Sequence, residues 1–192
     1  MIASFLGIYA LSTFSAFLLI PRLVLFLEKR SILLFAIAFA ALIPPIPILL
    51  YLNDILPGSG SWNLFFALAP FIYLANTCLS SSAIIRESML GDISDEVELE
   101  SKIGQQGLMY ASSSLIGKLN TGLGILVAGL ALEFIGFPQG SEVLPNADQI
   151  FNLAMVQGPF VAVMMIIPFG IFSFYKIDRQ RHKNILSQLE VR

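Results

Sequence analysis

The chain alternates between long apolar blocks and short polar connections. A helix needs about 20 apolar residues, at a rise of about 1.5 Å each, to cross the hydrocarbon core of a bilayer. Five blocks reach this length, and they are apolar around the whole helix rather than along one stripe. We therefore predict an all-α integral membrane protein with five transmembrane helices, over residues 1–20, 31–52, 62–85, 107–135 and 151–175.

The composition supports a lipid environment. Of the 192 residues, 56% are hydrophobic and only 12% are charged, whereas soluble domains carry roughly 25% charged residues. Such a chain has too few charges to cover a surface that faces water. No linker or low-complexity segment divides it, so we expect one transmembrane bundle over residues 1–192 with the lipid bilayer as its partner.

Prolines interrupt two of the predicted helices. The second block contains Pro44, Pro45 and Pro47, and the last contains Pro159 and Pro168. A proline inside a helix removes one hydrogen bond and bends the helix, and in a membrane the freed carbonyl is satisfied by neighbouring groups. We therefore expect kinked helices that still span the bilayer.

Basic residues occur only in alternate connections, which sets the orientation. The first connection, the third connection and the C-terminal tail contain them, and the other two connections contain none. Because cytoplasmic loops are rich in lysine and arginine, we expect a multi-pass protein of the cell (inner) membrane with its N-terminus outside and its C-terminus in the cytoplasm. The basic residues are Arg22, Lys29, Arg30, Arg86, Lys102, Lys176, Arg179, Arg181, Lys183 and Arg192.

Two further connections have distinct compositions. Residues 86–106 are acidic and include Asp92 and Asp95; we expect a solvated cytoplasmic loop, because the ligand spacing of a calcium loop is absent. Residues 138–150 contain turn-forming residues and no basic residue, which predicts an exposed external loop. His182 lies in the basic tail and is expected to be an ordinary surface residue.

Lys118 is the charged residue that lies deepest in an apolar block. A lysine near the centre of a membrane helix costs roughly 2.5–3.5 kcal/mol on insertion scales, which favours a polar partner or a watery cavity. Tyr110, Ser114, Lys118 and Thr121 recur at intervals of four, four and three, so they form one polar face of the helix. With the adjacent Asn120, they are the predicted residues of a solute or ion pathway.

The third block carries its own polar set, which has two interpretations. These side chains either line a cavity with the fourth block or form hydrogen bonds between helices. The set is Tyr73, Asn76, Thr77, Ser80 and Ser81.

Other classes of function have no support in the sequence. It shows no nucleophile with a base, no metal-binding cluster and no glycine loop for phosphate. It also lacks the basic stripe with interleaved aromatic residues that is typical of nucleic-acid binding. We therefore predict that the protein is not an enzyme, has no cofactor and has no nucleic-acid partner.

Residues 88–129 resemble the glycoside-pentoside-hexuronide:cation symporters of the major facilitator superfamily, the melibiose-permease type. Asp92-Ile-Ser-Asp95, Gly107, Lys118 and Gly122-Leu-Gly124 match the order and spacing of that family's motifs. The sequence departs from the family at Lys102-Ile-Gly-Gln-Gln, where a basic cluster is usual. The 21–30 segment also lacks the family's glycine.

The resemblance implies that the five blocks are helices eight to twelve of a twelve-helix transporter, a partial C-terminal six-helix half whose N-terminal half is missing. It implies symport of a sugar or a related small solute with Na⁺ or H⁺ by alternating access. Lys118 would face the central cavity and Ser114 would lie near the solute, while Asp92 and Asp95 would form the motif of a cytoplasmic loop. The family's cation-binding aspartates belong to the N-terminal half.

A second hypothesis does not involve transport. The chain would then be a stand-alone five-helix subunit for membrane interaction or assembly, and Lys118 would pair with an acidic residue of a partner. A reading frame directly upstream that encodes further helices would favour the transporter hypothesis.

Overall fold

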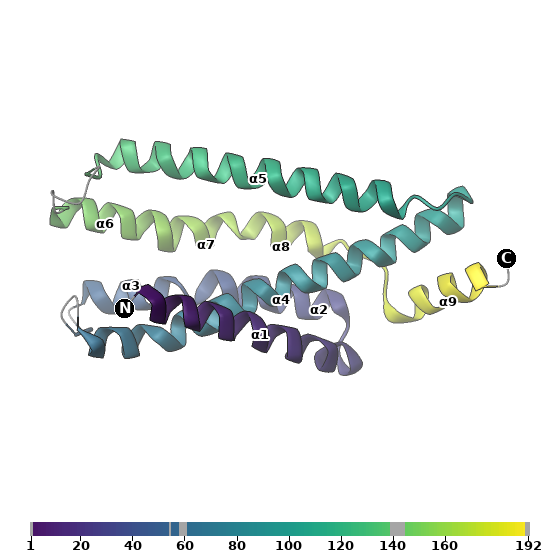
Figure 1. Ribbon diagram of the computed structural model, residues 1–192, viewed down its shortest axis with the longest axis horizontal. Coiled ribbons are helices and arrows are strands. Elements are labelled where there is room, and N and C mark those ends of the chain that lie inside the picture. Colours follow the sequence, from purple (N-terminus) through teal and green to yellow (C-terminus); the bar gives the residue numbers. More distant parts are fainter. Residues whose placement is uncertain (1, 54, 58–60, 139–144, 191–192) are drawn as a thin grey trace.

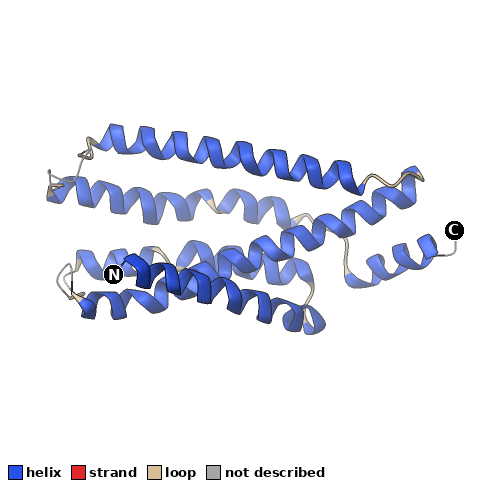
Figure 2. Cartoon of the chain, viewed as in Figure 1, coloured by secondary structure: helices blue, strands red, loops and turns tan. Residues whose placement is uncertain are grey.

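The computed structural model describes residues 2–53, 55–57, 61–138 and 145–190, and the elements within these residues are helices without any strand (Figure 2). In chain order they are α1 (Ile2–Phe26), α2 (Lys29–Leu42), α3 (Pro45–Leu52), α4 (Trp62–Ser101), α5 (Gln106–Ile135), α6 (Ala147–Met155), the π-helical turn η1 (Val156–Phe160), α7 (Val161–Met164), α8 (Ile166–Ser173) and α9 (Arg179–Glu190).

The helices form two layers (Figure 1). Helices α1 to α4 make up one layer, and α5 lies beside the continuous series α6, η1, α7 and α8 in the other. Helix α4 packs along α1 and α2, and its C-terminal end reaches across to the beginning of α5. The short helix α9 lies at this end of the bundle and contacts α4.

Five segments of the described residues are long and apolar enough to cross a membrane, which confirms the prediction of five spanning helices. A π-helical turn joins two helices in the last of them, and a proline break divides the second. The segments are Ala3–Phe26, Lys29–Leu52, Trp62–Ser101, Gln106–Ile135 and Ala147–Ser173.

Helix α1 continues beyond the predicted end at residue 20. It passes through Pro21 and ends at Phe26, so most of the expected 21–30 connection is helical. Only Leu27 and Glu28 separate α1 from α2. The run Leu23-Val-Leu-Phe26 can continue the helix because Pro21 removes only one hydrogen-bond donor from it.

The largest correction concerns the 86–106 segment. The sequence predicts a solvated acidic loop here, but α4 extends without interruption to Ser101. Its inner face is buried, including Met89, Asp92 and Ser94. The helix ends at Lys102, which adopts a left-handed conformation with φ of 64°. Packing and polar contacts to other helices stabilise the extension, and local sequence patterns do not reveal such contacts.

The proline interruptions occur where the sequence predicts them. Residues Ile43 and Pro44 separate α2 from α3. In the last span the π-helical turn contains Pro159, and Gly158 in the same turn lies against α3: a Cβ atom at Gly158 would come within 2.7 Å of Ile48 Cδ1. A side chain at position 158 would therefore displace the end of the Ile48 side chain.

The last span begins earlier than expected. Helix α6 begins at Ala147, within the predicted 138–150 external loop. Asn146 caps it: the side-chain oxygen accepts from the Gln149 backbone N–H at 2.8 Å, and Gln149 Oε1 accepts from the Asn146 N–H at 2.9 Å. Such a reciprocal pair satisfies two donors at a helix start. Residues 139–144 of the predicted loop lie outside the described residues.

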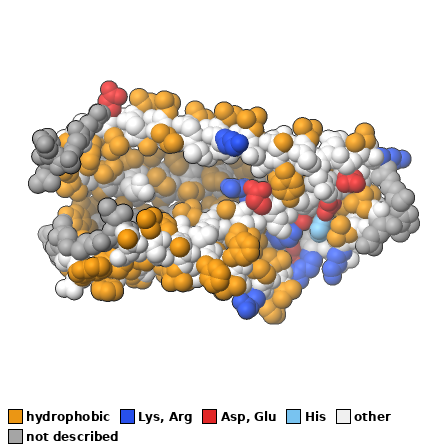
Figure 3. Space-filling view, in the orientation of Figure 1, with side chains coloured by type: hydrophobic (Ala, Val, Ile, Leu, Met, Phe, Trp, Pro, Cys, Tyr) orange, Lys and Arg blue, Asp and Glu red, His pale blue; other side chains and the backbone are white. Residues whose placement is uncertain are grey.

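The buried core is small and lies between α1, α2 and α4. Most large hydrophobic side chains remain exposed, and the visible surface is largely hydrophobic except at the α4–α9 end, where most of the charged groups gather (Figure 3). This distribution suits a bundle surrounded by lipid. No residue of α5 is buried. The core cluster consists of Ile20, Ile32, Leu33, Ile37, Ile85 and Met89.

Candidate functional site

A cavity of about 1030 Å³ lies between α4 and α5 and extends to the end of α8. Apolar side chains such as Leu90, Ile93 and Phe172 form part of its wall. Hydroxyl and amide groups of α5 form another part, and Arg86 and Glu87 also line it. The polar lining residues from α5 are Tyr110, Ser112, Ser113, Ser114 and Asn120.

The structure divides the predicted polar face of α5. Tyr110, Ser114 and Asn120 line the cavity, whereas Lys118 and Thr121 are not among its lining residues. Both are exposed on α5, and the Thr121 hydroxyl donates to the backbone oxygen of Gly117 at 3.0 Å. The cavity therefore gathers three of the four uncharged members of the predicted set.

Tyr110 approaches α4 closely because Gly91 has no side chain. The Tyr110 hydroxyl lies 3.5 Å from the backbone oxygen of Glu87, and it would lie 3.2 Å from a Cβ atom added at Gly91. A methyl group at Gly91 would press against this hydroxyl. Gly91 thus permits the contact between α4 and α5 at the wall of the cavity.

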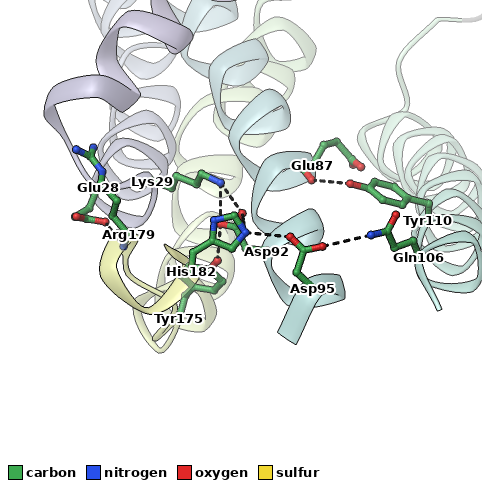
Figure 4. A network of polar contacts seen from close by, with 10 residues as sticks. All are labelled: Glu28, Lys29, Glu87, Asp92, Asp95, Gln106, Tyr110, Tyr175, Arg179 and His182. Carbon is green, nitrogen blue, oxygen red and sulfur yellow. Dashed lines mark hydrogen bonds and ion pairs between the residues drawn. The ribbon is translucent and has the colours of Figure 1, made fainter. Parts of the chain in front are cut away.

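Asp92 is the centre of a charge cluster next to the cavity (Figure 4). It is only 5% exposed. Lys29 Nζ donates to its two oxygens at 2.6 and 2.8 Å, and the Tyr175 hydroxyl donates to Oδ2 at 3.2 Å. His182 Nε2 lies 3.4 Å from Oδ1. The cluster joins α2, α4, the segment after α8, and α9.

Asp95 extends the cluster towards α5. It lies one turn after Asp92, on the same side of α4. Its Oδ2 is 3.0 Å from His182 Nε2, and its Oδ1 accepts from Gln106 Nε2 at 3.3 Å. The expectation that His182 is an ordinary surface residue is wrong, since its side chain is 24% exposed and contacts both aspartates. Asp92 and Asp95 therefore connect helices and are not part of a free loop.

Arg179 attaches α9 to the turn between α1 and α2. Its guanidinium donates to the backbone oxygens of Leu25, Leu27 and Val24, at 3.0 and 3.1 Å for the first two. These are free carbonyls at the end of a helix, where a cation is favourable. In return Glu28 accepts from the Arg179 backbone N–H at 3.2 Å.

Further contacts support this attachment. Arg181 of α9 pairs with Glu96 of α4. Burial, the negative charge of Asp92 and the hydrogen bond to Asp92 raise the pKa of Tyr175 well above its usual range, with a smaller contribution from Glu96. Tyr175 therefore remains a protonated donor to Asp92 at physiological pH.

A second polar region joins α1 to α4 within the spanning part of the bundle. The Tyr73 hydroxyl donates to Ser15 at 2.7 Å, and the Asn76 amide donates to Ser12 Oγ at 2.5 Å. The Thr13 and Ser80 hydroxyls lie 3.2 Å apart. Hydrogen bonding between helices therefore explains Tyr73, while Asn76 also borders an open pocket.

The residues that complete both regions do not stand out in the sequence. Lys29, Tyr175 and Arg179 lie far from Asp92 in the chain, and no local pattern connects them. The polar residues of α1, in contrast, follow a pattern that can be recognised in the sequence. Tyr9, Ser12 and Thr13 follow helical spacing, and this pattern would have indicated a polar face.

Among the described residues, no group of three or more histidine, cysteine, aspartate or glutamate side chains is arranged to hold a metal ion. The chemistry available in the cavity is hydrogen bonding by hydroxyl and amide groups next to apolar walls. This lining suits reversible binding of a small solute.

Five apolar helices with a polar cavity between two of them define an integral, multi-pass membrane protein. Residues 1–179 match the model of a family described as "MFS/sugar transport protein", and the chain belongs to this transporter family of the major facilitator superfamily.

Two named proteins are similar to the chain. An uncharacterised symporter of Synechocystis sp. is 28% identical over 137 residues, which is 69% of this chain and 25% of that protein. The sphingosine-1-phosphate transporter MFSD2B of Xenopus tropicalis is 26% identical over 115 residues, 59% of this chain and 22% of that protein. The matches thus cover about a quarter of these relatives. No solved structure matches the chain significantly.

Proposed function

We propose that the chain is part of a secondary transporter that moves a sugar or a related small solute together with Na⁺ or H⁺ by alternating access. The observation that carries the proposal is the cavity between α4 and α5, where Tyr110, Ser114 and Asn120 place uncharged polar groups inside a membrane bundle. Such groups can replace the water around a hydroxyl-rich solute. The similarity to a protein named as a symporter supports coupling to a cation.

The proposal assigns the chain to the C-terminal half of a melibiose-permease-like transporter that works with an N-terminal half. In such carriers the site lies near the bilayer midplane between two halves that move against each other. The open surface of α5, which has no buried residue, is consistent with a facing half. Asp92 and Asp95, in the family's cytoplasmic motif, would then hold the inner end of the half together.

Lys118 has a role in this proposal although it does not line the cavity. It lies twelve residues after the beginning of α5, about 18 Å along the helix axis. That depth is near the middle of the bilayer, where a charge without polar surroundings is costly. We propose that Lys118 and Thr121 face the solute or ion path between the two halves.

The proposed orientation has the N-terminus outside and the C-terminus in the cytoplasm of the cell (inner) membrane. Lys29 and the basic helix α9 lie at the same end of the bundle, next to Asp92. Both segments are basic, and the positive-inside tendency favours this end for the cytoplasmic side. The shared location supports the topology because the two segments cannot lie on opposite sides.

A transporter of this kind could also move a solute other than a sugar. The relative named as a sphingosine-1-phosphate transporter suggests an amphipathic solute. Leu90, Ile93 and Phe172 would suit its apolar part. A transport panel should therefore contain neutral sugars and a lysolipid.

A stand-alone subunit for membrane interaction is the second candidate function. The exposed Lys118 and the exposed surface of α5 favour it, because both would suit a partner helix with an acidic residue. Under this hypothesis, Lys118→Ala should cause loss of a complex with the partner and should not affect the uptake of any solute.

The test is coupled uptake by the full-length parent protein carrying Lys118→Ala. Removing the charge also removes the cost of placing it near the middle of the bilayer, so membrane expression should be close to parental while coupled uptake falls at least about tenfold. Lys118→Arg should also be impaired, since a planar guanidinium does not replace a compact ammonium. Lys183→Ala, at an exposed position of α9, is the matched control and should transport normally. Parental uptake and ion dependence in Lys118→Ala would contradict this role.

A further inference from the structure

A second polar surface lies where α1 meets α4, away from the cavity at α5. It consists of Tyr9 and Thr13 on α1 and Asn76 on α4. Thr13 follows the first residue of α1 by eleven positions, about 17 Å along the axis, and Asn76 follows the first residue of α4 by fourteen, about 21 Å. With a hydrocarbon core of about 30 Å that begins at the first residue of each helix, both residues would lie near its middle.

Packing between α1 and α4 uses only part of the hydrogen-bonding capacity of these residues. The Asn76 amide nitrogen donates to Ser12 Oγ and to the Tyr9 backbone oxygen, at 2.5 and 3.2 Å. It also lies 3.3 Å from Thr13 Oγ1. Within the described part of the chain, the Asn76 side-chain oxygen accepts no hydrogen bond and the Tyr9 hydroxyl makes none.

Neighbouring residues show that this incomplete pairing is specific to the surface. The Tyr73 hydroxyl donates to Ser15 at 2.7 Å, and the Thr77 hydroxyl donates to the backbone oxygen of Tyr73 at 2.7 Å. Both are satisfied between or within the helices. By contrast, Tyr9 is 47% exposed, and its hydroxyl has no hydrogen-bond partner within the described ranges.

The surface is hollowed into an open pocket of about 500 Å³. Tyr9, Thr13 and Asn76 supply its polar groups, and Phe14 and Phe17 supply exposed aromatic rings. Among the residues that the structure describes, no lysine, arginine, aspartate or glutamate lines it. Its chemistry is therefore that of an uncharged polar site with aromatic faces.

Lipid cannot satisfy these groups. An unpaired hydroxyl or amide oxygen in hydrocarbon costs several kcal/mol, so a surface with such groups at mid-depth must face water, a solute or another polar helix. We propose that Tyr9, Thr13 and Asn76 form a second solute-contacting surface, which binds an uncharged, hydroxyl-bearing part of the solute. This inference rests on the proposed transport function and extends it to α1.

The first experiment measures access of water to the surface in the full-length parent. Cys78, the only cysteine of this chain, is replaced by serine, and Thr13→Cys is then labelled with a negatively charged methanethiosulfonate reagent. Leu11→Cys is the matched control, because Leu11 is 58% exposed but lies about 200° around α1 from Thr13.

Thr13→Cys should react at least about tenfold faster than Leu11→Cys, and saturating lactose or galactose should slow it several-fold. Equal rates at the two positions would overturn the proposal, since the surface would then face lipid or a packed helix. Fast labelling that none of the probe sugars slows would also overturn it, because the surface would be wet without contacting the solute.

The second experiment removes single hydroxyl groups and measures uptake kinetics of the same sugars. Tyr9→Phe should raise KM about three- to tenfold with kcat nearly unchanged, the effect of one lost hydrogen bond to the solute. Tyr73→Phe is the matched control: it loses its bond to Ser15, so it should lower thermal stability and leave KM unchanged. A parental KM in Tyr9→Phe would overturn the proposal.

Failure of the proposed transport function would look different. The parent itself would then accumulate none of the panel solutes, whatever residue stands at position 9. The labelling experiment needs no transport, so it would still decide whether the α1–α4 surface lies in a water path and binds the probe sugars.

Discussion

Lys29 Nζ lies 2.6 and 2.8 Å from the two carboxylate oxygens of Asp92, so the first residue of α2 binds a buried position of α4 that lies 63 residues later. A cation at the beginning of a helix is unfavourable, because the free N–H groups there carry partial positive charge. Asp92 offsets this effect and is itself nearly inaccessible to water. Each residue therefore depends on the other.

Breaking the pair should destabilise the protein strongly. Lys29→Met leaves the buried Asp92 carboxylate without its main partner, and we expect a loss of about 3–5 kcal/mol in the free energy of unfolding in detergent. The double variant Lys29→Met with Asp92→Asn should lose less than the sum of the two single variants, since the double variant leaves neither charge of the pair without its partner. Additive losses would show that the two side chains are independent.

His182 should control the attachment of α9. It contacts Asp95 at 3.0 Å and Asp92 at 3.4 Å, and hydrogen bonds to charged groups contribute about 1.5–3 kcal/mol. We expect His182→Ala to increase amide hydrogen exchange in α9 about tenfold or more, with little change in α1. Lys183→Ala changes the next residue, which is exposed, and serves as the control. Unchanged exchange of α9 in His182→Ala would contradict this attachment.

Tyr175 should make the free energy of unfolding depend on pH in the alkaline range. Burial and the charge of Asp92 raise its pKa in the folded protein, whereas the unfolded chain releases this proton near the ordinary tyrosine value of about 10. The contribution of Tyr175 is therefore complete below about pH 10 and is lost as the pH rises towards the folded pKa. Thermal unfolding from pH 8 to 11 should show a smaller decline in Tm for Tyr175→Phe than for the parent. Equal declines in Tm for the parent and for Tyr175→Phe would contradict the raised pKa of Tyr175.

The proposed topology can be tested from both sides. A reporter fused after the C-terminus should be active only as a cytoplasmic fusion. Asn146 is a poor labelling position because its side chain caps α6, and losing the cap costs about 1 kcal/mol. Asp148 is exposed in the first turn of α6. Asp148→Cys, in a background with Cys78→Ser, should react with an impermeant reagent in intact cells. Protection of Asp148→Cys from the reagent, or an external C-terminus, would contradict the proposed orientation.

The spanning helices could be predicted because each contains about 20 apolar residues, and lipid requires little else of a helix. The extension of α4 to Ser101 could not, because acidic side chains resemble a solvated loop until Lys29, Tyr175 and His182 are placed beside Asp92. Helical spacing groups Tyr110 and Ser114 with Lys118 on one side of α5, and in the structure Tyr110 and Ser114 line the cavity. It did not separate Lys118 from the cavity, since spacing gives the face of a residue and not the position of neighbouring helices.

The length of α4 has a mechanical consequence. Its 40 residues make a rod of about 60 Å, twice the thickness of the hydrocarbon core, and Pro70 is the only proline within it. Asn76 and Asp95 therefore lie on one continuous helix, about 28 Å apart along its axis. A tilt of about 10° around Asn76 would displace Asp95 by about 5 Å, more than the length of its contact with His182. A small rotation of α4 at mid-membrane would thus be large enough to make or break contacts at the far end of the helix.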